Sequence, residues 1–236
     1  MTEKSHSKFD ASRAGEYGQQ ARIALAGYDA CHELTACILS ASLEGQKDVR
    51  ILVVGAGGTA GEIIAAGKLE SDWKFLAVDP SEPMAAFAQH QIQEAHLEDR
   101  VEFVIGELSE LPIETKYDAA IMIGVLHHIA DDNDKGILLS QIAARLKSNA
   151  PMVVAGNYRS YGSEPLLMAA WAARWRMHGV EHDEVQAKLG KILDGANPPE
   201  NEAKVEQLLA DAGFEKPQRF FSSLFWGAWH TIRTVG

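Results

Sequence analysis

Apolar stretches of two lengths alternate through the middle of the chain. Short runs rich in β-branched residues predict buried strands at 50–54, 74–78, 101–105, 118–123 and 152–155. Longer amphipathic stretches between them predict helices at 60–69, 82–97 and 133–147, and Ser81 is the expected N-cap of the second of these helices. Apolar strands that alternate with helices are typical of a parallel sheet with right-handed crossovers.

The two ends of the chain differ in their residue pattern from this alternating middle part. Residues 1–15 are polar and expected to be frayed, and the helical pattern of 16–43 is divided at Gly27. Residues 164–191 are helical and bulky, and they are too long for an ordinary crossover loop, so we expect them to lie over the top of the sheet. The chain is predicted to close with a helix at 200–212, its cap at Gly213, and strands at 214–224 and 226–234.

The predicted fold class is therefore α/β: a Rossmann-like, seven-stranded, mostly parallel sheet with helices on both faces. A chain of 236 residues with 46% hydrophobic content suits one domain with one buried core. We expect four segments in it: an N-terminal helical cap (1–47), a core (48–156), a helical insertion (157–199), and a closing helix with a β-hairpin (200–236).

Charge and cysteine content narrow the partners. The net charge is -11, from 22 basic and 33 acidic side chains, and no basic run is present, so nucleic acid is a poor default partner. Cys31 and Cys37 have neither a metal spacing nor a disulfide pattern, which predicts buried apolar thiols in a reducing cytoplasm. Met1–Asp10 lacks the apolar segment of a signal peptide, and no run of about 18 apolar residues predicts a membrane span.

The first core strand runs directly into a glycine cluster, which a helix follows. Gly55, Gly57 and Gly58 permit backbone angles that a Cβ forbids, and they let a ligand lie on the main chain. In open α/β sheets, the carboxyl end of such a strand is where a nucleotide-like ligand binds. A plain structural turn is the alternative interpretation.

Polar residues follow the next strands at the same sheet edge. Asp79 ends the second strand, where a carboxylate can accept hydrogen bonds from both hydroxyls of a ribose, although a solvated turn aspartate is equally compatible. Met84 is placed to cover one face of an adenine. Glu107, after the third strand, can accept from an adenine amino group, and Gly124 after the fourth strand would line the same cleft.

This series of motifs resembles the class I S-adenosylmethionine-dependent methyltransferases over residues 48–156. The resemblance implies that S-adenosyl-L-methionine is the cofactor and S-adenosyl-L-homocysteine the product. It implies these cofactor-binding residues: Gly55, Ala56, Gly57, Asp79, Pro80, Met84, Gly106, Glu107, Leu108, Ile123 and Gly124. In that assignment the glycine loop contacts the amino-acid part of the cofactor.

The glycine loop departs from the family pattern in one respect. Such proteins usually carry an acid two places before the first glycine, where this chain has Val53, and the continuation through Gly61 is one or two residues longer. We therefore expect Arg22 or Tyr17, from the N-terminal helices, to hold the amino-acid end of the cofactor.

The flanks are similar to a narrower group, the carboxy-S-adenosylmethionine synthases and their methyltransferase relatives. The similar segments are 23–28, 209–214, 220–221 and 225–227. Those synthases act in wobble-uridine modification of transfer RNA and use an arginine in the inserted helices to bind the extra carboxylate. Here Gly190-Lys191 falls near that position. This favours ordinary methyl transfer, with the synthase as the alternative.

Catalytic and substrate residues are expected around the same edge. His127 and His128 are candidates for a general base, or else only a wall of the cleft. The candidate substrate-binding residues are Tyr28, His32, Tyr158, Arg159, Tyr161, Trp171 and Trp175. Trp171 and Trp175 share one helix face, so packing of the core or of a lid is the alternative for them. No metal site is predicted.

The sequence thus predicts methyl transfer to an O, N or C nucleophile of a small molecule, as in secondary metabolism. Neither nucleic acid nor membrane is an expected partner, and the aromatic C-terminal strands make a homodimer plausible. Two rivals remain: an NAD-dependent dehydrogenase, which would use the same glycine loop and Asp79, and a non-catalytic cofactor-binding protein.

Overall fold

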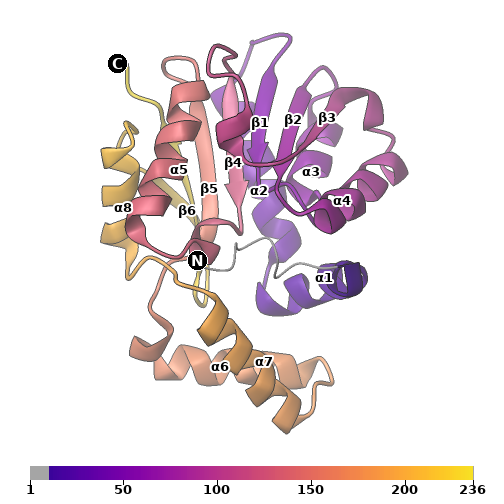
Figure 1. The fold of residues 1–236 in the computed structure, drawn as a ribbon, viewed down its shortest axis with the longest axis vertical. Helices are drawn as coiled ribbons and strands as arrows, with labels where there is room; N and C mark the ends of the chain where they lie inside the picture. Colours follow the sequence, from indigo (N-terminus) through magenta and orange to yellow (C-terminus); the bar gives the residue numbers. More distant parts are fainter. Residues whose placement is uncertain (1–10, 236) are drawn as a thin grey trace.

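A computed structural model describes residues 11–235 and has one seven-stranded sheet in the order β3-β2-β1-β4-β5-β7-β6 (Figure 1). The strands are β1 (Arg50–Val54), β2 (Lys74–Asp79), β3 (Val101–Ile105), β4 (Ala119–Ile123), β5 (Pro151–Asn157), β6 (Gln218–Ser223) and β7 (Trp226–Ile232). Strands β1 to β5 are parallel, β7 runs antiparallel to β5, and β6 runs antiparallel to β7. The predicted Rossmann-like, mostly parallel sheet is confirmed.

Helices cover both faces of the sheet. They are α1 (Ala11–Ala24), α2 (Tyr28–Ser42), α3 (Gly61–Leu69), α4 (Glu82–Glu94), α5 (Asp132–Arg145), α6 (Pro165–Met177), α7 (His182–Gly195) and α8 (Glu202–Asp211), with 3-10 turns η2 (Glu98–Arg100), η3 (Leu108–Glu110), η4 (Leu126–His128) and η5 (Tyr161–Ser163). No helix among residues 11–235 is long and apolar enough to cross a membrane.

The central strands are buried on both faces, which explains their continuous apolar runs. Side chains of β1 alternate between two core clusters: Leu52 and Val54 pack toward α5 and α8, whereas Ile51 and Val53 pack toward α2, α3 and α4. This arrangement holds the carboxyl ends of β1, β2 and β4 side by side, where the glycine loop and the end of β2 meet.

The N-terminal helices divide where the sequence predicts. Gly27 adopts a φ of +82° between α1 and α2, a conformation that glycine reaches without steric cost. Helix α1 already begins at Ala11, so the expectation of frayed residues up to 15 is wrong for 11–15. Residues 1–10, for which the sequence predicts a polar end without a signal peptide, lie outside the described part of the chain.

The inserted region, predicted to be helical over 164–191, consists of two helices. A turn at Gly179, with φ of +82°, separates α6 from α7. Figure 1 shows both beyond the end of the sheet at which β5 finishes. Trp171 and Trp175 are 2% and 3% exposed and form a small core with Ile23 and Phe225. The packing interpretation of these two tryptophans therefore fits their surroundings.

Two smaller expectations are right only in part. Ser81 occupies the N-cap position of α4, but its side chain makes no capping hydrogen bond; its backbone N–H donates instead to Asp79. Cys31 is buried as predicted, whereas Cys37 is exposed, because it lies on the outward face of α2.

Replacement of Gly55 by alanine tests the close packing of the loop. A Cβ at Gly55 would lie 2.1 Å from Cγ2 of Val125, and φ is +72° there. We expect Gly55→Ala to lower the free energy of unfolding by about 1–3 kcal/mol. Gly136→Ala is the matched control inside α5, where nothing lies within 4 Å of the added Cβ, and it should raise that free energy by about 0.5–1 kcal/mol. Denaturant unfolding measures both, and equal values would contradict the packing argument.

Candidate cofactor and acceptor site

The glycine loop turns sharply at the end of β1 and is fastened to β2. The backbone N–H groups of Gly55 and Ala56 donate to the carbonyl of Val78, over 2.8 and 3.2 Å. Gly58 has a φ of +98°, and Ala60, just before α3, has a φ of +48°. Ala60 thus accepts a strained left-handed conformation, which indicates that the surrounding structure determines the shape of the loop.

Asp79 connects this loop to the start of α4. Its Oδ2 accepts from the N–H of Gly57, and its Oδ1 accepts from the N–H of Ser81, each over 2.8 Å. Burial raises the pKa of this carboxyl, the two backbone bonds lower it, and the charges of Glu62 and Glu107 raise it again, so that the pKa lies above its ordinary value. A carboxylate has further lone pairs, so Asp79 can still accept from ligand hydroxyls.

The residues proposed for the adenine gather beside Asp79. Met84 is 4% exposed on α4, and its backbone oxygen accepts from the N–H of Gly58. The N–H of Gly106 donates to the carbonyl of Asp79. Glu107 is exposed, and Leu108 is buried in the core. Pro80 is exposed, Ile123 is half-buried, and Gly124 turns the chain after β4 with a φ of +80°.

Helix α1 lies directly over the loop. The ring of Tyr17 covers Gly58 so closely that a Cβ there would be 2.5 Å from the ring. Burial raises the pKa of Tyr17 to about 12, with help from the charges of Glu62 and Asp79. Arg22 lies nearby but is engaged: its guanidinium donates to both oxygens of Asp29, over 2.7 and 3.1 Å. This bidentate pair balances the charge of Arg22, and its role at the amino-acid end of the cofactor stays a prediction.

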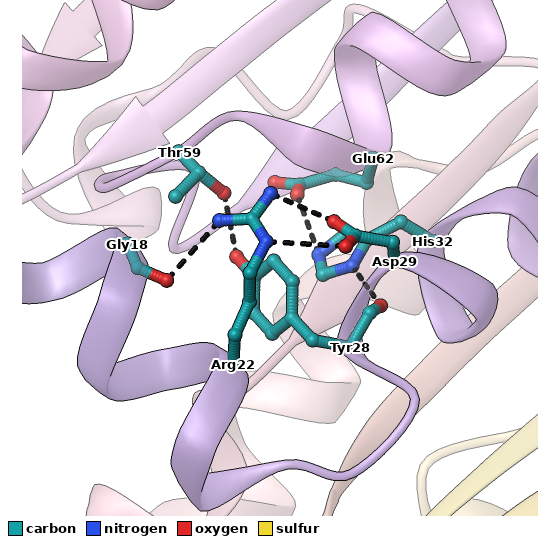
Figure 2. Close-up of polar contacts among 7 residues, drawn as sticks. All are labelled: Gly18, Arg22, Tyr28, Asp29, His32, Thr59 and Glu62. Atoms are coloured by element: carbon teal, nitrogen blue, oxygen red, sulfur yellow. Dashed lines mark hydrogen bonds and ion pairs between the residues drawn. The ribbon is translucent and has the colours of Figure 1, made fainter. Parts of the chain in front are cut away.

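A buried polar cluster lies between α2 and the loop (Figure 2). The hydroxyl of Tyr28 bonds that of Thr59 over 2.5 Å, and Nε2 of His32 lies 3.3 Å from Oε2 of Glu62. Burial lowers the pKa of His32, but Glu62, the carbonyl of Tyr28 and the charge of Asp29 together raise it by more, so that the net shift is upward. The sequence predicts substrate contacts for Tyr28 and His32, and it predicts no role for Thr59 and Glu62. The sequence signal for Glu62 is an acidic residue directly after the glycine cluster, in a chain that has Val53 instead of an acid two places before the first glycine.

A second group of polar side chains lies at the ends of β4, β5 and β7. His127 is 5% exposed, its Nδ1 accepts from the N–H of Asn157 over 3.4 Å, and its ring meets the edge of Trp226 at 5.4 Å. Burial lowers the pKa of His127 well below its ordinary range, with contributions from His128 and Lys135. His127 is therefore neutral near pH 7.

Two buried atoms in this second group have no hydrogen-bond partner among the side chains of residues 17–235 and the described backbone. They are Oδ1 of Asn157, an acceptor, and Nε1 of Trp226, a donor, and the two residues are register partners on β5 and β7. Buried polar atoms of this kind are costly unless something satisfies them. With neutral His127 beside them, they form a polar wall suited to a hydroxyl or amine.

The other predicted substrate residues make contacts within the protein itself. Tyr158 is 1% exposed in the core under α5 and α8, and its hydroxyl accepts from Arg159. Arg159 also pairs with Glu164. Tyr161 accepts from the amide of Asn157 over 2.6 Å and therefore adjoins the polar wall. Of these residues, Tyr161 is the one linked to His127 through Asn157, and its ring stacks on Trp171.

A surface hollow of the molecule lies away from this edge of the sheet. No group of three or more potential metal ligands occurs in the part of the chain that is described. A hollow of about 490 Å³ between α5 and α8 is lined by Ile113, Asp132, Ile137, Ser140, Leu208 and Asp211. None of the predicted cofactor residues lines it.

The core of the chain matches a known family. Residues 52–152 match the family model described as a methyltransferase domain. A search of curated protein sequences finds no match. The family match covers the glycine loop, Asp79, Glu107 and the two histidines, and it confirms the resemblance that these motifs carry. It does not extend to the flanks, so their similarity to carboxy-S-adenosylmethionine synthases stays a prediction.

Solved structures share the fold. The chain is similar to a candidate O-methyltransferase from Nostoc punctiforme PCC 73102, at 14% identity and a TM-score of 0.67, over 94% of this chain and 59% of that one. It is similar to the mitomycin 7-O-methyltransferase MmcR, at 17% identity and a TM-score of 0.61, over 86% and 54%. It is also similar to human N-acetylserotonin methyltransferase in complex with S-adenosylmethionine, at 16% identity and a TM-score of 0.59, over 97% and 61%. The chain thus spans less than two thirds of each of these proteins.

The two buried histidines should titrate on opposite sides of pH 6.5, the ordinary histidine value. We expect the ring signals of His32 in NMR spectra to remain those of imidazolium above pH 6.5, and those of His127 to remain neutral well below it. Since the folded pKa of His32 is raised, its stabilising contribution is complete below pH 6.5 and is lost as the pH rises through the folded value. Glu62→Gln should lower the pKa of His32; an unchanged titration would contradict the pairing.

Proposed function

We propose that this chain, a class I methyltransferase domain at residues 52–152, transfers a methyl group from S-adenosyl-L-methionine to an oxygen, nitrogen or carbon nucleophile of a small molecule. The observation that carries the proposal is the position of the Asp79 carboxylate. A buried carboxylate at the end of β2 is held by the glycine loop and by the start of α4, beside Met84 and Glu107.

The chemistry of the surrounding groups fits this cofactor. Ribose hydroxyls can donate to Asp79, an adenine amino group can donate to Glu107, and Met84 offers an apolar surface. The close packing of the loop against these residues depends on glycine: a Cβ at Gly57 would lie 2.6 Å from both Oδ2 of Asp79 and Cβ of Met84. The cofactor supplies the activated methyl group; the protein supplies alignment and exclusion of water.

The charges at the loop favour S-adenosylmethionine over NAD. S-adenosylmethionine carries a sulfonium and an ammonium, whereas NAD carries a pyrophosphate. Glu62, Asp79 and Glu107 influence one another at this edge, and Arg22 is already paired with Asp29. Acidic groups of this kind repel a pyrophosphate and attract cations.

The acceptor would bind at the polar wall. His127 is the candidate base at this wall: its ring is neutral near pH 7, its lowered pKa makes it a weak base, and Nδ1 is the nitrogen without a proton. The orphaned atoms of Asn157 and Trp226 would fix the orientation of that group. The names of the similar structures, among them a mitomycin 7-O-methyltransferase, support a small-molecule acceptor and a place in secondary metabolism.

Calorimetry with S-adenosylmethionine, S-adenosylhomocysteine and NAD tests the cofactor. We expect binding of the first two and not of NAD. Asp79→Asn should weaken binding by about 1.5–3 kcal/mol, because hydrogen bonds to a charged group are lost. Asp72→Asn, at the opposite end of β2 and exposed, is the control and should change nothing. Tight binding of NAD alone would overturn the proposal, and mass spectrometry of a co-purified carboxylated nucleoside would support the synthase instead.

Replacement of His127 tests the acceptor side. His127→Asn should lower kcat by about 10²- to 10⁴-fold with an acceptor that must lose a proton, while the affinity for S-adenosylhomocysteine stays constant. The measurement is formation of S-adenosylhomocysteine from a panel of phenols and amines. An unchanged kcat would mean that His127 is only a wall of the cleft.

A further inference from the structure

We infer that Glu62, oriented by His32, is the carboxylate that binds the ammonium group of the cofactor's methionine moiety. This inference rests on the proposed function and assigns a residue that the sequence motifs do not point to. It answers the question raised by Val53, which occupies the place where the family usually carries an acid.

Strand β1 has no group for this task. Val53 is 1% exposed and packs in the cluster with Ile63 and Phe75, so its side chain is part of the core. Among the predicted partners for the amino-acid end, Arg22 is cationic and paired with Asp29, and an ammonium would be repelled by it. Tyr17 is a neutral phenol, since burial raises its pKa to about 12.

Glu62 is a buried carboxylate in the first turn of α3, directly after the glycines, and is 7% exposed. Burial raises the pKa of Tyr17 and of Asp79, and the negative charge of Glu62 raises both further. Glu62 directly follows Gly61, on which its partner His32 packs, so Glu62 lies at the α3 end of the glycine loop. Its position suits a ligand whose amino-acid part follows that loop from the ribose site at Asp79.

His32 is positioned to donate to Glu62. Nδ1 of His32 lies 2.8 Å from the carbonyl of Tyr28, and Nε2 lies 3.3 Å from Oε2 of Glu62 (Figure 2). A carbonyl and a carboxylate are both acceptors, so both ring nitrogens donate and the ring is an imidazolium. The imidazolium packs on Gly61, where a Cβ would lie 3.0 Å from its Cδ2.

This pair uses only part of the carboxylate. His32 contacts Oε2, and a carboxylate has about four acceptor positions over its two oxygens. Among the side chains that the structure describes (residues 17–235), His32 is the basic group that pairs with Glu62, and Asp79 is a second acid at the loop. The acids at the loop therefore favour an added cation. The ammonium of S-adenosylmethionine or S-adenosylhomocysteine is a cation of this kind.

A purely structural role is the competing explanation, because the His32–Glu62 pair also joins α2 to α3. The two roles differ in their dependence on the ligand. 5′-Methylthioadenosine has the adenine, the ribose and a thioether sulfur, but neither an amino nor a carboxyl group. Loss of an ammonium contact weakens S-adenosylhomocysteine and spares methylthioadenosine, whereas a collapsed loop weakens both.

Calorimetry with these two ligands on Glu62→Gln tests the inference. We expect a 10- to 100-fold weaker Kd for S-adenosylhomocysteine and less than a twofold change for 5′-methylthioadenosine. Glu70→Gln is the matched control, since Glu70 is a half-buried glutamate at the other end of α3 that accepts from Ser40. It should leave both affinities unchanged.

The remaining outcomes are equally decisive. Equal weakening of both ligands, or of neither, in Glu62→Gln overturns the inference while binding to wild type upholds the proposed function. Failure of wild type to bind either ligand overturns both. If Glu62→Gln melts well below wild type, Glu62→Asp keeps the charge but withdraws it, and it should again discriminate between the two ligands. His32→Gln should weaken S-adenosylhomocysteine less than Glu62→Gln does, as expected for a positioning residue.

Discussion

The hydrogen bonds of Asp79 to the backbone of Gly57 and Ser81 are the constraint on which the rest of the site depends. They fasten the turn after β1 to the start of α4 through one buried carboxylate at the end of β2. This contact needs glycine at 57, because a Cβ would collide with the same carboxylate. The parallel register of β1 and β2 brings the two ends together, so the geometry of the sheet determines the geometry of the loop.

Helices from both flanks of the chain enclose this edge. Tyr17 of α1 lies on the glycine loop, and α6 is tied to the last turn of α1 by bonds from Trp171 and Arg174 to backbone carbonyls of Ala24 and Ile23. The inserted helices thereby support α1.

The two buried histidines show how the same side chain is set to opposite states. His32 lies between a carbonyl and a carboxylate, which favour the imidazolium. Burial lowers the pKa of His127, and the nearby His128 and Lys135 lower it further. One histidine thus adds a fixed charge near the loop, and the other stays neutral beside the polar wall of Asn157 and Trp226.

The sequence by itself determined the order of strands and helices, the glycine turn, Asp79 and Glu107, because these depend on local pattern and on the rule that parallel strands end at one edge. Only the tertiary structure decided which distant side chains meet. Arg22 pairs with Asp29, Tyr158 is buried in the core, and Cys37 is exposed to solvent. Glu62 looked like an ordinary helix residue, and its partner His32 is thirty positions earlier. Their contact depends on how α2 packs against α3, and no local pattern encodes that packing.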